Sequence, residues 1–180
     1  MKIVAIALLL SASGSLLAQV RVDNGKHTRL QRFARDAAYG TAEGLGYAFV
    51  DQSRGVPPEW GTGTQGYEKR AASNVGEFLI QEGVTEGFAA ALDRPLDYPR
   101  CHCSGTANRI GHALIGAVAD QRADGTRTFA IPRVAGAYAG AFAQTSWRPG
   151  SDSHARTALI NGSVSLAIGA AINLIQEFVR

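Results

Sequence analysis

The sequence predicts an all-α protein, built as a single bundle of about five closely packed helices that contain glycine. Apolar residues recur in five segments at the three-to-four-residue spacing of a helix. Clusters of proline and glycine separate these segments, as is typical of loops. A chain of 180 residues that carries a short leader is also of the right size for one domain, which can bury a core without a metal or a disulfide.

The chain begins with the pattern of a secretory signal peptide. A lysine supplies a positive charge, residues 3–10 are apolar, and small residues follow. The apolar run is too short for a membrane-spanning helix. We expect cleavage after Ala18, with Gly14 as a rival position, so that residues 1–18 are a signal peptide and residues 19–180 form a single helical domain. The mature protein is then expected to be secreted into the periplasm or onto the cell envelope.

The first two helices are predicted on either side of a proline-bearing loop. Residues 28–50 place apolar side chains at helical spacing, with arginines and acidic residues between them. Residues 51–66, "DQSRGVPPEWGTGTQG", concentrate proline and glycine and predict a loop. Residues 67–92 return to helical spacing, although three glycines weaken the helical propensity of this segment.

Three more helices are predicted in the second half of the chain. Pro95 and Pro99 disfavour helical geometry in the residues before them, so residues 93–105 are expected to be a connection. The third helix is predicted over residues 106–121. An Asp-Gly turn signal follows it and would suit a short hairpin if strands flanked it. The last two helices are predicted over residues 131–147 and 154–179.

Glycine recurs at intervals of four within several predicted helices. Each glycine in a helix costs about 1 kcal/mol relative to alanine, so we expect an offsetting gain from close approach of the helix backbones. Small-xxx-small steps of this kind allow such an approach in membrane helices and in tight soluble bundles. The residues predicted to pack in this way are Gly40, Gly44, Gly83, Gly87, Gly136, Gly140, Ser165 and Gly169.

The last helix raises the question of a membrane. Residues 158–175, "ALINGSVSLAIGAAINLI", are 18 residues without a charge, which meets the lower limit for a spanning helix. Asn161, Ser165, Gly169 and Asn173 form a polar-to-small stripe along it, and amides are costly against lipid. We therefore favour a central helix buried in a soluble or peripherally attached bundle, with membrane insertion as the alternative.

Charge and motifs argue against several classes of function. The formal net charge is +3 and the charges are scattered, so no nucleic-acid surface is expected. Residues 61–66, "GTGTQG", match the letters of a dinucleotide-binding fingerprint, but a proline-bearing loop precedes them where a strand is needed. We therefore interpret them as a flexible loop that leads into a helix, and we expect no cofactor.

No catalytic set stands out among the polar residues. Glu82 and Glu86 lie one helical turn apart and are interpreted as a solvated acidic face, because no Glu-x-x-His step accompanies them. Residues 151–154, "SDSH", cannot form a catalytic triad among neighbours in a helix start, so helix capping is favoured.

Both cysteines of the chain lie in "RCHCS". An extended Cys-x-Cys segment places its Cα atoms near or beyond the limit of about 7 Å for a disulfide, so a bridge between Cys101 and Cys103 would be strained and labile. A labile bridge or thiols without function are favoured. Redox chemistry, metal binding by Cys101, His102, Cys103 and His112, and bridging to another chain are the alternatives.

Four segments carry a resemblance to a known family: "EWGTGTQGYEKRAASNVGEF", "ALDRPLDYPR", "RIGHALIGAV" and the ending "INLIQEFVR". From Trp60 onward the chain resembles an uncharacterised family of exported bacterial proteins, with a Trp-Gly step, a Gly-aromatic-x-x-Arg entry to a helix, an Asp-Pro-Arg-Tyr-like turn and an Asn-x-x-x-Glu-Phe ending. Here Tyr98 precedes Pro99, and Cys101 stands where the family has an aromatic residue. The resemblance implies an exported helical envelope protein and assigns no active site.

Together these observations predict a non-catalytic structural or interaction role in the cell envelope. The partner would be an unknown protein or a second copy of the chain, with possible membrane contact. Two alternatives stay open: an integral or peripheral membrane protein that oligomerises through its small-xxx-small faces, and a thiol-redox or metal-binding protein that uses residues 101–103.

Overall fold

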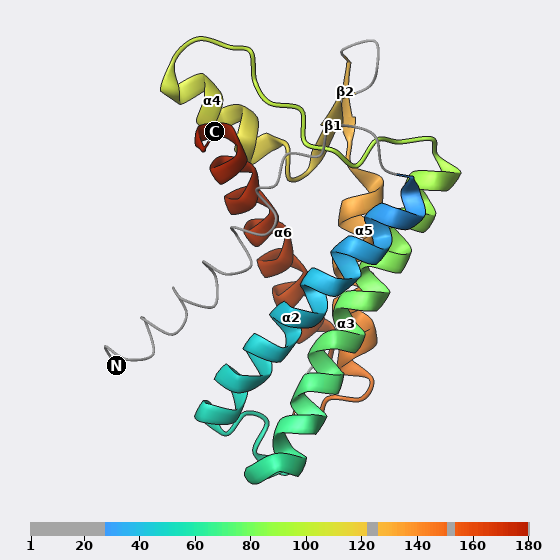
Figure 1. The fold of residues 1–180 in the computed structure, drawn as a ribbon, viewed down its shortest axis with the longest axis vertical. Coiled ribbons are helices and arrows are strands. Elements are labelled where there is room, and N and C mark those ends of the chain that lie inside the picture. Colours follow the sequence, from blue (N-terminus) through green and yellow to red (C-terminus); the bar gives the residue numbers. More distant parts are fainter. Residues whose placement is uncertain (1–27, 122–125, 151–153, 180) are drawn as a thin grey trace.

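The computed structural model describes residues 28–121, 126–150 and 154–179, which form an all-α bundle of five helices with one small hairpin (Figure 1). The predicted signal peptide and the predicted capping residues 151–153 lie outside the described residues. The helices are α2 (Arg29–Arg54), α3 (Gly63–Ala91), α4 (Thr106–Ile115), α5 (Ile131–Thr145) and α6 (His154–Phe178), with a short 3-10 helix, η1 (Pro58–Trp60), between α2 and α3.

The hairpin corrects the predicted third helix, which was expected to extend to residue 121. Helix α4 ends at Ile115, and strand β1 (Ala119–Gln121) pairs antiparallel with β2 (Arg127–Phe129). The apolar run "ALIGAVA" continues the helical pattern past the true end of α4, which hides the change of structure. Strands do flank the Asp-Gly signal, as a hairpin at this place requires.

The long helices pack in a row. The main contacts join α2 to α3, α3 to α5, α5 to α6 and α6 to α4. Helices α2 and α3 lie side by side, and α6 runs at an angle to them (Figure 1). Because α3 and α5 occupy the middle of this row of long helices, α2 and α6 are its two ends.

Small residues let these neighbours approach closely. A Cβ atom added at Gly44 would lie 2.9 Å from Val75 Cγ2, and one added at Gly40 would overlap the ring of Phe78. On α5, a Cβ atom at Gly136 would lie 2.6 Å from the carbonyl oxygen of Gln81, and one at Gly140 would lie 2.8 Å from that of Glu77. The α2–α3 and α3–α5 contacts therefore depend on glycine.

The same prediction is wrong for Gly83, Gly87 and Gly169. A Cβ atom built at each of these glycines meets nothing within 4 Å among the described residues. Gly83 and Gly87 lie on an exposed face of α3, and spacing alone does not reveal which face of a helix has a neighbour. Ser165 makes a polar contact instead, because its hydroxyl donates to Gln81 Oε1 at 2.9 Å.

One buried arginine shapes the connection between α2 and α3. Arg70 is fully buried, and its guanidinium donates to the carbonyl oxygens of Val56 (2.7 Å), Pro57 (2.8 Å) and Gly61 (2.9 Å). It also donates to Oε1 of Gln52 at 2.7 Å. These hydrogen bonds tie the carbonyl groups of the connection to the first part of α3.

Candidate functional site

A large groove follows the row of helices. It has a volume of about 1490 Å³ and is lined by one face each of α2 and α6, with residues of α3 and α5 between them. On α6 the lining residues extend from Thr157 to Gln176, which at 1.5 Å per residue is about 30 Å of helix.

Helix α6 forms the apolar side of the groove and is far less buried than the sequence predicts. Only 11% of its most apolar 18-residue window is buried, and Val164, which lines the groove, is 52% exposed. The expected central helix, covered on all sides, is therefore wrong. Within the described residues, α6 is the one helix long and apolar enough to cross a membrane.

The opposite side of the groove carries carboxyl groups with raised pKa values. Burial, together with the nearby charges of Asp36 and Glu86, raises the pKa of Glu82 to about 7. Burial also raises the pKa of Glu43, although a hydrogen bond with Tyr47 lowers it in part. These acids come from α2 and α3.

Four arginines along the groove are paired with acids other than Glu43 and Glu82. Within the part of the chain that the structure describes, no arginine or lysine forms an ion pair with Glu43 or Glu82. The pairs formed by the groove's arginines include Arg32–Asp97 (3.0 Å), Arg35–Asp36 (2.9 Å), Arg133–Asp120 (2.9 Å) and Arg148–Asp51 (3.0 Å).

The predicted solvated acidic face is consequently wrong for Glu82, which lines the groove and is largely desolvated. Its neighbour Glu86 instead approaches Arg32 at 3.7 Å. Sequence reasoning missed the groove because its two sides come from helices more than 100 residues apart, and no local pattern joins them.

The cysteine segment forms a second candidate site, in the loop between α3 and α4. Cys101 and Cys103 are joined in a disulfide with their Cα atoms 5.1 Å apart, inside the usual range. The expected wide, extended spacing is wrong, because the loop bends at this point. The described residues contain no group of three or more histidine, cysteine or acidic side chains placed to hold a metal. His102 is exposed.

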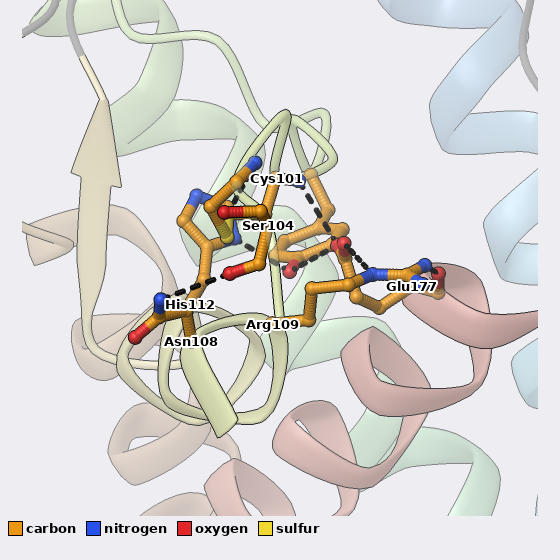
Figure 2. The surroundings of a disulfide bond; sticks show 8 residues. Cys101, Ser104, Asn108, Arg109, His112 and Glu177 are labelled. Carbon is orange, nitrogen blue, oxygen red and sulfur yellow. Dashed lines mark hydrogen bonds and ion pairs between the residues drawn. A yellow bond between two sulfur atoms is a disulfide. The ribbon is translucent and has the colours of Figure 1, made fainter. Parts of the chain in front are cut away.

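A buried carboxylate fastens this loop to the end of α6 (Figure 2). Glu177, which is 2% exposed, accepts hydrogen bonds from the Cys101 backbone N–H (3.0 Å), the Tyr98 hydroxyl (3.0 Å) and Arg109 Nε (3.1 Å). Arg109 also donates to the backbone oxygen of Glu177. Burial alone would raise the pKa of Glu177, but these hydrogen bonds and the Arg109 charge lower it below its usual value.

The predicted ligand His112 belongs to this network. Its Nδ1 lies 2.8 Å from the Tyr98 hydroxyl oxygen. Since that hydroxyl donates to Glu177, we assign the proton on the imidazole to Nδ1, which then donates to Tyr98. Burial and the Glu177 charge raise the pKa of Tyr98 well above its usual value. His112 thus helps to orient Tyr98.

Two further sequence motifs, "GTGTQG" and "SDSH", lie at or near the starts of helices. Residues 61–66 follow η1 and enter α3 without a preceding strand, so they lack the setting of a dinucleotide site. Of the "SDSH" segment, His154 is described, and its Nδ1 donates to the Thr145 carbonyl oxygen at 2.7 Å.

Sequence reasoning also missed Glu177 as the centre of a network. One feature of the sequence could have pointed to Glu177. It is the first charged residue after Arg156 in a long apolar helix.

Comparisons with protein-family models, with curated proteins and with solved structures find no match for this chain.

Proposed function

We propose that the mature chain is an exported, non-catalytic interaction protein of the cell envelope, which binds an amphipathic helix of a partner protein in the groove between α2 and α6. The observation that carries this proposal is the exposure of α6 along a groove of about 1490 Å³. Exposed apolar surface of this extent is typical of binding sites in soluble proteins. A helix laid into an apolar groove is a recurrent mode of recognition.

The two sides of the groove suggest the chemistry of the guest helix. Val164, Ile168 and Ile172 offer an apolar wall for its apolar face. Glu43 and Glu82, on the acidic side, favour basic residues on the guest, because a nearby cation would stabilise their ionised forms. We therefore expect the guest to be an apolar and basic amphipathic helix.

A second candidate rests on the length and composition of α6. This helix is long and apolar enough to cross a bilayer, so the same exposed side chains would suit a chain anchored in, or lying on, an envelope membrane. The small-xxx-small steps would then serve oligomerisation in the membrane.

Two matched substitutions on α6 distinguish these candidates. Val164 (52% exposed) lines the groove, whereas Leu159 (51% exposed) does not. Binding of a fluorescent leucine–lysine amphipathic helical peptide would be measured by anisotropy, and flotation with phosphatidylethanolamine–phosphatidylglycerol vesicles would be measured in parallel. We expect Val164→Asp to weaken peptide binding at least about tenfold and Leu159→Asp to leave it unchanged.

Other outcomes of these measurements would contradict the proposed groove or support the membrane candidate. Peptide binding that is absent, or that Val164→Asp leaves unchanged, contradicts a groove for helices. Vesicle flotation of the wild-type protein that both substitutions abolish supports the membrane candidate instead. Circular dichroism of each variant verifies that the helices are retained.

A further inference from the structure

We propose that the Cys101–Cys103 bridge is a thiol–disulfide exchange site, which accepts electrons from an exposed dithiol of another exported protein. The bridge joins residues two apart in a loop between two helices, and both cysteines are partly exposed. An incoming thiolate can therefore reach the sulfur atoms without unfolding of the bundle. Neither cysteine lines the groove, and this site does not depend on the function proposed for the groove.

The two sulfur atoms are not equivalent. The backbone N–H of Cys103 donates to Sγ of Cys101 at 3.3 Å. Such a donor stabilises negative charge on Sγ of Cys101 and makes that sulfur the better leaving group. We therefore infer that the substrate thiolate attacks Sγ of Cys103.

The surroundings of Cys101 keep this leaving group in place. Its own backbone N–H is held by Glu177, whose carboxylate would by itself oppose a nearby thiolate. Arg109 pairs with that carboxylate at 3.1 Å and offsets its charge (Figure 2). The loop is thus anchored at Cys101, and Cys103 is the partner free to carry a substrate during exchange.

The exchange balances without a further reagent. A substrate thiolate forms a bond to Sγ of Cys103 while the Cys101–Cys103 bond breaks, and Cys101 leaves as a thiolate. The second substrate thiol, after losing its proton, attacks the substrate sulfur of the mixed disulfide and expels Cys103 as a thiolate. Two electrons pass from the substrate dithiol to the protein, and the two cysteine thiolates take up protons.

The first test compares the two single-cysteine variants. Cys103→Ser leaves Cys101 free and keeps the backbone N–H of residue 103, whereas Cys101→Ser leaves Cys103 free. Alkylation by iodoacetamide would be followed against pH by intact mass. We expect Cys101 to be alkylated about fivefold faster at neutral pH than Cys103, with a lower thiol pKa. Equal rates, or the reverse order, contradict the assigned leaving group.

The second test uses the folded wild-type protein with millimolar reduced glutathione. We expect a mixed disulfide on Cys103, located by fragmentation after acid quenching, followed by full reduction of the bridge with an unchanged helical circular dichroism spectrum. A bridge that glutathione reduces only after the protein is unfolded in urea is a structural link and overturns the proposal.

Discussion

At the scale of single residues, Glu177 shows how one charge can organise a helix end. It is nearly fully buried at the end of an otherwise apolar helix and collects donors from the disulfide loop and from α4. The guanidinium of Arg109, in turn, lies 4.5 Å from the ring centre of Phe178, so it is held on two sides. The position of the loop on α6 follows from these contacts.

Replacement of Glu177 by glutamine tests this role. The amide keeps the shape of the side chain but removes the charge that pairs with Arg109 and one acceptor oxygen, which leaves buried donors without partners. We expect the free energy of unfolding, measured by urea denaturation, to fall by about 2–3 kcal/mol. Glu68→Gln, at an exposed position of α3, is the matched control and should change it by less than about 0.5 kcal/mol. Equal effects of the two substitutions would contradict the role of Glu177.

The sequence allows partial prediction at this scale. Pro95 and Pro99 correctly indicate that the cysteines lie in a connection, because proline restricts its local backbone. The bridge itself depends on how the loop bends, which Glu177 influences from 76 residues away. The local sequence around the cysteines cannot predict a contact between residues so far apart in the chain.

At the scale of elements, the glycines divide into those that permit helix contact and those that do not. The five helices were predictable from apolar spacing and from the proline and glycine clusters between them. Which face of each helix contacts a neighbour was harder to predict. Gly136 and Gly83 occur in similar small-xxx-small steps, yet they have different surroundings. Only the packing partner distinguishes the two glycines.

A pair of alanine substitutions measures this difference. In Gly136→Ala the new methyl group would lie 2.6 Å from the backbone carbonyl oxygen of Gln81, so α3 and α5 must separate. We expect a loss of about 1–3 kcal/mol in the free energy of unfolding. In Gly83→Ala the methyl group meets no atom within 4 Å, and we expect a gain of up to about 1 kcal/mol from helix propensity. Thermal and urea denaturation provide the measurement, and a stabilising Gly136→Ala would contradict the close contact.

At the scale of the whole molecule, the arrangement in a row explains why α6 is exposed. Length and apolar composition predict a helix that avoids water, but they do not say how many neighbours cover it. In a closed bundle α6 would also pack against α2, whereas here its main contacts are with α5 and α4. The groove is therefore a property of the packing order, which the sequence alone did not reveal.

The groove also makes stability depend on pH. Because the pKa of Glu82 is raised to about 7 by folding, the folded protein holds a proton that the unfolded chain releases at lower pH. The free energy of unfolding should thus fall as the pH rises from about 4.5 to about 7. We expect Glu82→Gln to reduce this decline and to be more stable than the wild type at pH 8, in urea titrations at each pH.

Glu68→Gln again serves as the control and should leave the pH dependence unchanged. A Glu82→Gln variant that is less stable than the wild type at pH 8 would show that the ionised carboxylate is stabilised in the groove.

The hydrogen bonds that Arg70 makes with the α2–α3 connection differ from the groove in their response to pH. Arg70 donates chiefly to backbone carbonyl oxygens, and neither those oxygens nor the amide of Gln52 changes its protonation state in the range where proteins remain folded. A guanidinium likewise stays charged throughout that range. The hydrogen bonds of Arg70 thus do not depend on protonation, whereas the groove and the α6 terminus contain carboxylates that respond to acidification.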